Sequence, residues 1–320
     1  MTETTKEIFE KYEVRKTKEQ KAAFRDYLTS VAKDKGYKVV TEESGKSVKN
    51  VIVGDPGSAE VIYTAHYDTC AVMPLPNFIS PKCLPLYILY QLVLSLIIYI
   101  IPFSIMLSAN PILEATGSKA LFALALYGGY ALLLGMTYLV INGPANKHTA
   151  NDNTSGVTLL IDIMSELPEE LKSKVAFIFF DLEERGTVGS KCYKKLHPRV
   201  AKEKLILNFD CVSDGKNILF VPKKGAYDKE GAIAEAFTPT GEYTDSYSVE
   251  VARKAFYPSD QRNFERGVGV SALNKSKSGI LYMDKIHTKR DTVYDEENIA
   301  FLKTGAIRLA EMLAKEKVEL

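Results

Sequence analysis

The sequence lacks a large excess of either charge and has no close cluster of cysteines. Its 320 residues include 41 basic and 40 acidic side chains, which leave a formal net charge of +1. This balance gives no reason to expect nucleic acid as a partner. The four cysteines are widely spaced, at Cys70, Cys83, Cys192 and Cys211. Such spacing argues against a disulfide framework or a zinc knuckle and fits a reducing compartment.

Internal repeats, low-complexity tracts and Gly/Ser linkers are also absent. Charged residues make up 25% of the chain and hydrophobic residues 46%, which is ordinary for a globular protein. The length allows one large domain or two smaller ones. The first twenty residues are charged throughout and contain no apolar signal-peptide core. We therefore expect the polar part of the chain to stay in the cytoplasm.

Charge is almost missing from one internal segment. Residues 83–146 carry only Glu114 and Lys119 in 64 positions, whereas the other 256 residues carry 79 charged groups. Residues 84–107 and 120–141 have no charge at all. As helices, these stretches would reach roughly 36 and 33 Å, enough to cross a hydrocarbon core of about 30 Å. The segment is therefore predicted to be a transmembrane hairpin with helices at about 84–107 and 120–141.

Details of the predicted hairpin fit a membrane environment. Pro102 would kink the first helix, while Gly128, Gly129 and Gly135 would let the second helix approach it closely. A pair of buried core helices or an apolar dimerisation cap is the alternative, although soluble core helices seldom run this long without charge. The short link puts both polar parts on one side, and the weak excess of Lys and Arg favours the cytoplasmic side of the cell membrane.

Outside the hairpin, predicted strands and helices alternate. Residues 5–34 read as one amphipathic helix, and further helices are expected at 154–167, 187–196 and 296–315. Short apolar runs predict strands at 37–41, 50–53, 61–65, 175–180, 205–209, 218–222 and 280–283. This alternation favours a three-layer α/β/α fold around a central, mostly parallel mixed sheet. The domain would be discontinuous, formed by residues 1–82 and 147–320, with the hairpin of residues 83–146 inserted.

Carboxylates and histidines follow apolar runs at five places. These are His66-Tyr-Asp68, Asn151-Asp152-Asn153, Asp181-Leu-Glu183-Glu184, Asn208-Phe-Asp210 and Ile286-His287-Thr288. Strand carboxyl ends converge on one crevice, and a mixed set of nitrogen and oxygen ligands suits a pair of zinc-like ions. Each motif alone has a simpler interpretation as a cap, a turn or a solvated pair. The combination of motifs outweighs these simpler interpretations, because two of the four histidines lie in them. The other two, His148 and His197, are expected in a loop and in a surface turn.

The order of these motifs resembles that of the co-catalytic di-zinc aminopeptidase family. The segments TAHYDT, ANDNTSGV, FFDLEERGTVGS, LNFDCVSDG and IHTKRDT carry the resemblance, which covers residues 17–316 and skips the hairpin. Relatives in this family include leucyl aminopeptidases, aminopeptidase Y, glutamate carboxypeptidase II and glutaminyl cyclases. His66 and Asp152 are 86 residues apart, and removing the 64-residue insert leaves 22. The resemblance leads one to expect such a short connection, so the hairpin is predicted to lie in a loop beside the active site.

The resemblance implies a role for each matching residue. Asp152 would bridge two divalent ions, most simply Zn²⁺. His66 and Asp210 would complete the ligands of one ion, and Glu184 and His287 those of the other. The remaining two site residues would be Asp68, which orients the His66 imidazole, and Glu183, the general base. Tyr257-Pro-Ser259-Asp260-Gln261 resembles a substrate-side stretch in which relatives often have Ser-Asp-His. Gln261 replaces that histidine, which leaves the details of substrate contact open.

These roles together imply a membrane-anchored zinc aminopeptidase. Its expected partners are peptides with a free N-terminus and the lipid bilayer, with no nucleic acid, while the oligomeric state stays open. A zinc-dependent cyclising or amide-processing enzyme, like the glutaminyl cyclases, is an alternative, and those relatives typically use one zinc. A non-catalytic binding module or membrane scaffold is a further alternative. All five ligand positions and the base are present, which favours the enzyme.

Overall fold

The computed structural model describes residues 1–45 and 47–316, and its centre is a mixed nine-stranded sheet. The strand order is β1-β2-β4-β3-β5-β8-β6-β7, and β9 pairs with β8. The strands are β1 (Val39–Ser44), β2 (Val48–Val53), β3 (Val61–His66), β4 (Val175–Phe180), β5 (Leu205–Phe209), β6 (Asn217–Pro222), β7 (Ser248–Val251), β8 (Gly267–Lys275) and β9 (Leu281–Tyr282). The central strands β4, β3, β5 and β8 run parallel, whereas β2 and β6 are antiparallel to their central neighbours.

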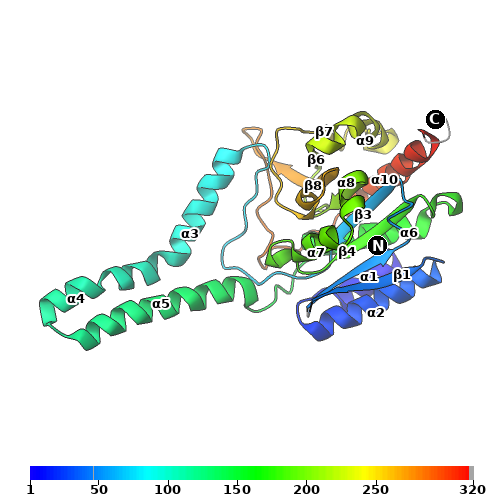
Figure 1. Ribbon diagram of the computed structural model, residues 1–320. Helices are drawn as coiled ribbons and strands as arrows, with labels where there is room; N and C mark the ends of the chain where they lie inside the picture. Colours follow the sequence, from blue (N-terminus) through cyan, green and yellow to red (C-terminus); the bar gives the residue numbers. More distant parts are fainter. Residues whose placement is uncertain (46, 317–320) are drawn as a thin grey trace.

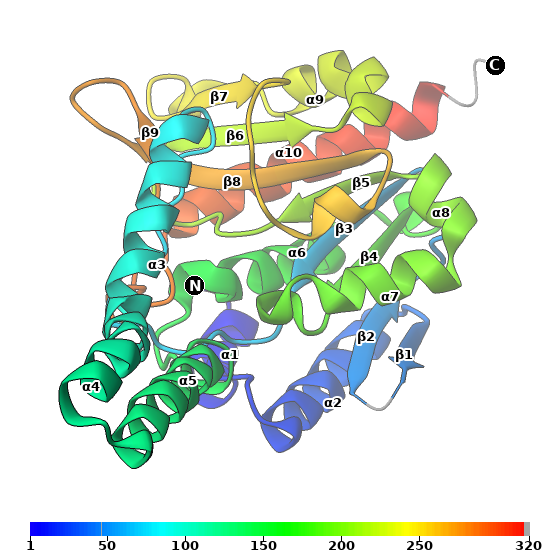
Figure 2. The ribbon, with the colours of Figure 1, turned by 60° about the vertical axis from the view of Figure 1, so that its left-hand side comes forward.

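Helices cover both faces of this sheet (Figure 2). One face packs against α1 (Glu3–Lys11), α2 (Lys18–Asp34), α6 (Ser155–Glu166), α9 (Glu230–Ala236) and α10 (Glu296–Glu316), and the other against α7 (Val188–Leu196) and α8 (Pro198–Glu203). Along β4, Phe177 and Phe179 join the first core, while Ile178 and Phe180 join the second. Side chains of a strand alternate between faces, so a strand covered on both sides reads as one apolar run. The predicted three-layer α/β/α fold is confirmed.

The predicted helix over residues 5–34 is wrong in one respect, because the structure has two helices there. Thr17 caps α2 through a capping box in which its side chain accepts from the Gln20 backbone N–H. The break between α1 and α2 carries Arg15, which is fully buried. Its guanidinium donates to the carbonyl oxygens of Tyr67 at 2.6 Å and Tyr12 at 2.7 Å. The guanidinium thus ties the break between the two helices to the segment that follows β3.

Strand β8 was not predicted, although it is the longest strand in the described part of the chain. It begins with Gly267 and Gly269, residues that are usually depleted in strands. A Cβ at Gly267 would lie 2.1 Å from the carbonyl oxygen of Gln261, and one at Gly269 would lie 2.6 Å from Gln261 Nε2. The glycines are therefore required by the close approach of the segment around Gln261. The run at 280–283 forms only the two-residue β9.

The hairpin projects away from the sheet as three helices (Figure 1). These are α3 (Leu84–Leu107), α4 (Ala109–Thr116) and α5 (Lys119–Asn142), so the predicted long helices agree closely and the link is itself mostly helical. Two apolar spans, Leu84–Thr116 and Lys119–Asn142, are long enough to cross a membrane by length and composition, and only 17% and 11% of their most apolar windows are buried. They are thus not core helices of this chain.

Gly129 sets the distance between the two long helices. A Cβ there would lie 2.5 Å from Met106 Cγ and 3.0 Å from the Pro102 carbonyl oxygen. A Cβ at Gly128 or Gly135 would meet nothing within 4 Å. Only one of the three predicted glycines therefore serves the contact between α3 and α5. Pro102 lies inside α3 and is buried against that contact.

A short pair of extended segments joins the hairpin to the domain. Ala71 and Ala145 form an antiparallel bridge. The Val72 N–H donates to the Pro144 carbonyl at 2.8 Å, and the Asn146 N–H donates to the Cys70 carbonyl at 3.1 Å. The chain thus leaves the sheet just after β3 and returns just before α6. This geometry is expected when an insertion occupies one loop.

Candidate metal centre

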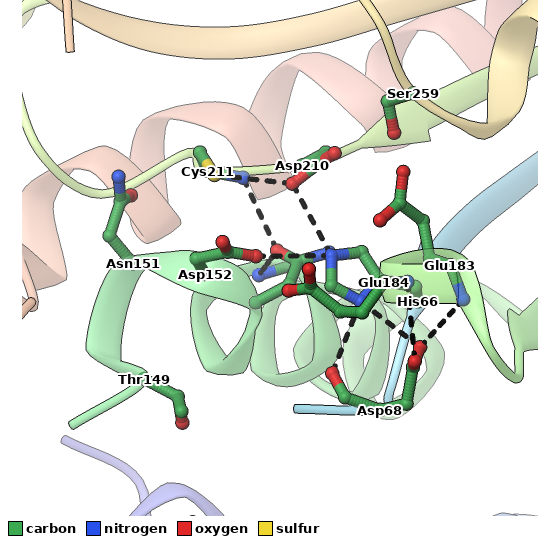
Figure 3. A network of polar contacts seen from close by, with 12 residues as sticks. His66, Asp68, Thr149, Asn151, Asp152, Glu183, Glu184, Asp210, Cys211 and Ser259 are labelled. Carbon is green, nitrogen blue, oxygen red and sulfur yellow. Dashed lines mark hydrogen bonds and ion pairs between the residues drawn. The ribbon is translucent and has the colours of Figure 1, made fainter. Parts of the chain in front are cut away.

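The parallel register brings the predicted site residues to one edge of the sheet. His66 is the last residue of β3 and lies beside Phe180, the last residue of β4. Asp210 follows β5, and Glu183 and Glu184 form a turn of 3₁₀-helix after β4. Asp152 lies in a non-helical kink of the backbone just before α6, and His287 reaches in from the loop after β9. The structure thus brings together every residue that the sequence predicts for the site. Figure 3 labels all of them except His287.

The first group of side chains surrounds His66. Its Nε2 lies 3.2 Å from Asp152 Oδ1 and 3.5 Å from Asp210 Oδ1. All three residues are buried, and their ligand atoms lie within 4.8 Å of one another. One imidazole nitrogen and two carboxylate oxygens at this spacing could hold a divalent ion.

The second group surrounds His287. Its Nε2 lies 3.1 Å from Asp152 Oδ2 and 3.3 Å from Glu184 Oε2. The two carboxylate oxygens of Asp152 therefore face different histidines. Cys70 Sγ also belongs to this group, with every ligand atom within 4.8 Å of the others. The sequence analysis did not assign Cys70 to the site.

Asp68 links the first histidine to the glutamate turn. Its Oδ1 lies 3.5 Å from His66 Nδ1 and accepts from the Glu183 N–H at 2.9 Å. Its Oδ2 accepts from the Glu184 N–H at 3.3 Å. Figure 3 shows the Glu183 side chain on the opposite side of His66 from Asp68, pointing toward Asp210 and Ser259. Asp68 therefore holds the backbone of the two glutamates and lies beside the imidazole of His66, whose Nδ1 is also 3.3 Å from the Asp68 carbonyl oxygen.

Asp291 is a site residue that the sequence analysis missed. Its Oδ1 accepts from the Asn151 N–H at 2.8 Å, and its Oδ2 accepts from the Asp152 N–H at 3.0 Å. It holds the backbone of Asp152, which presents its two oxygens to the histidines. The signal was available, since Asp291 is part of the IHTKRDT motif, four residues after His287. Burial and the nearby Asp152 carboxylate raise the pKa of Asp291 to about 7.

Not every residue in the segment around Gln261 faces the metal centre. Gln261 is 1% exposed, and its Nε2 donates to the Tyr257 carbonyl at 2.8 Å. Its Oε1 accepts from Asn208 Nδ2 at 3.3 Å, so this side chain supports the core. Asp260 is also buried, and Ser190 donates to its Oδ1. Burial and nearby carboxylates such as Asp210 raise the pKa of Asp260 to about 7.

The two histidines predicted to lie elsewhere do so. His197 stacks on Tyr193 with ring centroids 4.4 Å apart and contacts the Glu42 carboxylate. His148 is exposed in the loop before α6. Neither takes part in a candidate metal group among residues 1–45 and 47–316.

The centre contains more carboxylates than its two histidines could neutralise. Burial raises the pKa of Glu184 to about 8 and that of Glu183 well above its ordinary value. Burial alone would also raise the pKa of Asp152, but its contacts with His287 and His66 hold that pKa below the ordinary value. A buried carboxylate is costly without a counter-charge. Carboxylates crowded in this way are typical of a site completed by cations.

The donor set fits divalent cations for a second reason. Glu184 Oε1 is buried and has no hydrogen-bond partner among the described residues. An unsatisfied buried oxygen beside an imidazole and a second carboxylate is explained if a metal ion completes the group. Imidazole and carboxylate ligands suit zinc and similar ions.

The chain belongs to peptidase family M28, whose family model matches residues 136–312. No curated protein sequence gives a significant match. The fold is similar to that of a glutaminyl cyclase from Bacteroides thetaiotaomicron bound to N-acetylhistamine, at 14% identity and a TM-score of 0.57, covering 96% of this chain and 94% of that one. It is also similar to the LapA aminopeptidase of Legionella pneumophila, at 13% identity and a TM-score of 0.56, covering 96% and 69%. A leucine aminopeptidase precursor from Bacteroides thetaiotaomicron matches at 15% identity and a TM-score of 0.56, covering 96% and 93%.

Proposed function

We propose that the protein is a membrane-anchored aminopeptidase that uses two zinc ions to remove residues from the free N-terminus of peptides. One observation carries this proposal. The Asp152 carboxylate offers one oxygen to His66, beside Asp210, and the other to His287, beside Glu184. A carboxylate shared between two sets of donors is suited to bridge neighbouring ions. Membership of a peptidase family supports hydrolysis of a peptide bond.

The ions and Glu183 have separate tasks in this proposal. When bound, two zinc ions would polarise the peptide carbonyl and lower the pKa of a water molecule. Glu183 would take the proton of the attacking water at its carboxylate and return it to the departing amine. Asp68 would hold Glu183 in place through the 2.9 Å bond to its backbone N–H. The negative charge of the centre would favour the ammonium group of a free peptide N-terminus.

The hairpin supplies the membrane anchor in this proposal, and residues 1–82 and 147–320 form the peptidase domain. Lys16 Nζ donates to the Ile141 carbonyl at 3.4 Å, and Arg185 donates to Asn142 Oδ1 at 2.6 Å. Both cations line a cleft of about 490 Å³, in which four further basic residues outnumber Glu19 and Asp181, the latter paired with Lys21 at 2.6 Å. Basic side chains beside the end of an apolar span are typical of the cytoplasmic face. They support a cytoplasmic catalytic domain.

A cyclising enzyme is the second candidate, and the fold similarity to glutaminyl cyclases favours it. The five predicted ligands fall into two groups around Asp152, which favours a two-ion hydrolase over an enzyme with one zinc. Metal content measured on the purified protein separates the two. Two zinc ions per chain are expected for the aminopeptidase and one for the cyclase.

Turnover of matched peptides tests the proposal directly. The full-length protein in detergent should release the first residue from free peptides but not from their N-acetylated forms. A zinc chelator should stop release without unfolding the domain, and added zinc should restore it. Equal cleavage of free and acetylated peptides would refute the aminopeptidase assignment. Conversion of N-terminal glutamine without hydrolysis would favour the cyclase, and activity that survives complete zinc removal would contradict the metal assignment.

A further inference from the structure

Cys70 lies among the ligand atoms of the second group. Its Sγ and the ligand atoms of Asp152, Glu184 and His287 are all within 4.8 Å of one another. Cys70 is 2% exposed and is not part of a disulfide. Thiolate, imidazole and carboxylate are the three side-chain ligand types found in zinc sites. The second group therefore contains four potential zinc ligands, whereas the group of His66, Asp152 and Asp210 contains three.

Two atoms in the second group lack the contacts that buried polar atoms normally have. Glu184 Oε1 is buried without a hydrogen-bond partner among the described residues. Among the residues that the structure describes, Cys70 Sγ also makes no hydrogen bond. Cys211 provides a contrast, because its Sγ donates to Asp210 Oδ1 at 3.2 Å. The Cys211 thiol is therefore satisfied within the protein, while that of Cys70 is left facing the ligands.

The backbone fixes Cys70 at this place. The Cys70 carbonyl accepts from the Asn146 N–H at 3.1 Å, which ties it to the returning end of the hairpin. Three residues later, the Met73 N–H donates to the His287 carbonyl at 2.7 Å. The segment that carries Cys70 is thus bonded to the loop that carries the histidine of the same group. A ligand held in this way needs little rearrangement to bind a metal.

We propose that Cys70 Sγ is a ligand of the second metal position, together with Asp152, Glu184 and His287. This inference rests on the proposed two-ion centre. On binding, the thiol loses its proton to solvent and the sulfur donates an electron pair to the ion. The second position then has four protein ligands and the first has three. A soft sulfur ligand favours zinc over magnesium or manganese, so the second position should be the more zinc-selective one.

X-ray absorption at the zinc edge tests this assignment on the full-length, zinc-loaded protein. A zinc–sulfur distance of about 2.3 Å is resolved from zinc–nitrogen and zinc–oxygen distances of about 2.0–2.2 Å. The wild type should show a sulfur shell of about half a sulfur per zinc, because one thiolate is shared over two ions. Cys211→Ser should keep this shell. Cys70→Ser should lose it and bind its second zinc about tenfold or more weakly.

Each outcome is decisive. Two bound zinc ions without a sulfur shell in the wild type would overturn the role of Cys70 and leave the two-ion centre standing. A shell that survives in Cys70→Ser but disappears in Cys211→Ser would assign the sulfur to Cys211 and also overturn the proposal. Absence of bound zinc would refute the two-ion centre itself. If Cys70→Ser does not fold, Cys211→Ser still decides, because no other cysteine belongs to a metal group in the described chain.

Discussion

The hairpin and the α/β domain differ in where each places its apolar side chains. Of the large apolar side chains that are exposed in the described residues, all but Met1, Val40 and Leu196 belong to the hairpin. In the domain, apolar side chains fill cores on both faces of the sheet, and polar groups such as His66 and Asp152 are buried at one edge. A large exposed apolar surface requires a partner or a bilayer. In the proposed function, the hairpin therefore determines the location of the protein and the domain its chemistry.

Glu183→Gln should have the largest effect, and it should affect the domain alone. The amide cannot accept the water proton, so peptide hydrolysis should fall by about 10²–10⁴-fold. The variant keeps the five predicted metal ligands, so zinc content by mass spectrometry should stay at two per chain. Membrane association should also be unchanged. Glu170→Gln, an exposed carboxylate outside the site, is the matched control. Nearly full activity in Glu183→Gln would contradict the assigned base.

Two single substitutions of similarly exposed leucines by lysine should have different effects in the hairpin and in the domain. Leu134 on α5 is 56% exposed and Leu196 on α7 is 51% exposed. In a bilayer, Leu134→Lys should cost about 2.5–3.5 kcal/mol, whereas Leu196→Lys on a hydrated surface should change stability by less than about 0.5 kcal/mol. The share of protein recovered in the membrane fraction after alkaline extraction measures the difference. Equal recovery of both variants would show that α5 does not lie in lipid.

The proposed metal ligands could be singled out in the sequence because their motifs occur in the order that the family resemblance implies, and His66, Glu184 and Asp210 also lie at or just after strand ends. Asp291 was missed although it lies within the IHTKRDT motif, because its role is to accept two backbone N–H groups from residues 139 and 140 positions away, and no local pattern indicates such contacts. Cys70 was dismissed because a thiol with no second cysteine nearby in sequence gives no ligand pattern. Strand β8 was missed because Gly267 and Gly269 are required by tertiary contact with Gln261, and local propensity does not register such contact.

Gly129→Val should weaken the hairpin by a moderate amount. Its side chain would overlap Met106 Cγ and the Pro102 carbonyl, and overpacking of this kind costs about 1–3 kcal/mol. Gly135→Val on the same helix is the matched control, because a Cβ at Gly135 has no other atom within 4 Å. Protease resistance of the loop around α4 in detergent reports the closure of the hairpin. Peptidase activity should be retained in both variants. Identical protease resistance would mean that α3 and α5 are not packed as the structure has them.

Asp162 provides a test with an expected effect of the same order as that of Gly129→Val, and it concerns the free-energy cost of burying a charge in the domain. This α6 side chain is 8% exposed, and its Oδ1 accepts from Thr2 Oγ1 at 3.4 Å. Burial raises the pKa of Asp162 from 3.8 to about 6. The unfolded chain therefore releases this proton at lower pH than the folded chain, and stability falls as pH rises from about 4 to 6.

Asp162→Asn removes this cost without changing the shape of the side chain. The free energy of unfolding should rise by about 1–3 kcal/mol at pH 7 and should match the wild type below pH 4, where Asp162 is protonated in both states. Thermal unfolding of the solubilised protein at several pH values measures this. Asp26→Asn, on the exposed side of α2, should shift the melting temperature little at any pH. A gain that does not depend on pH would show that the buried charge is not its cause. The hairpin has no counterpart to this test, because Glu114 and Lys119, its only charged residues, are exposed at its tip.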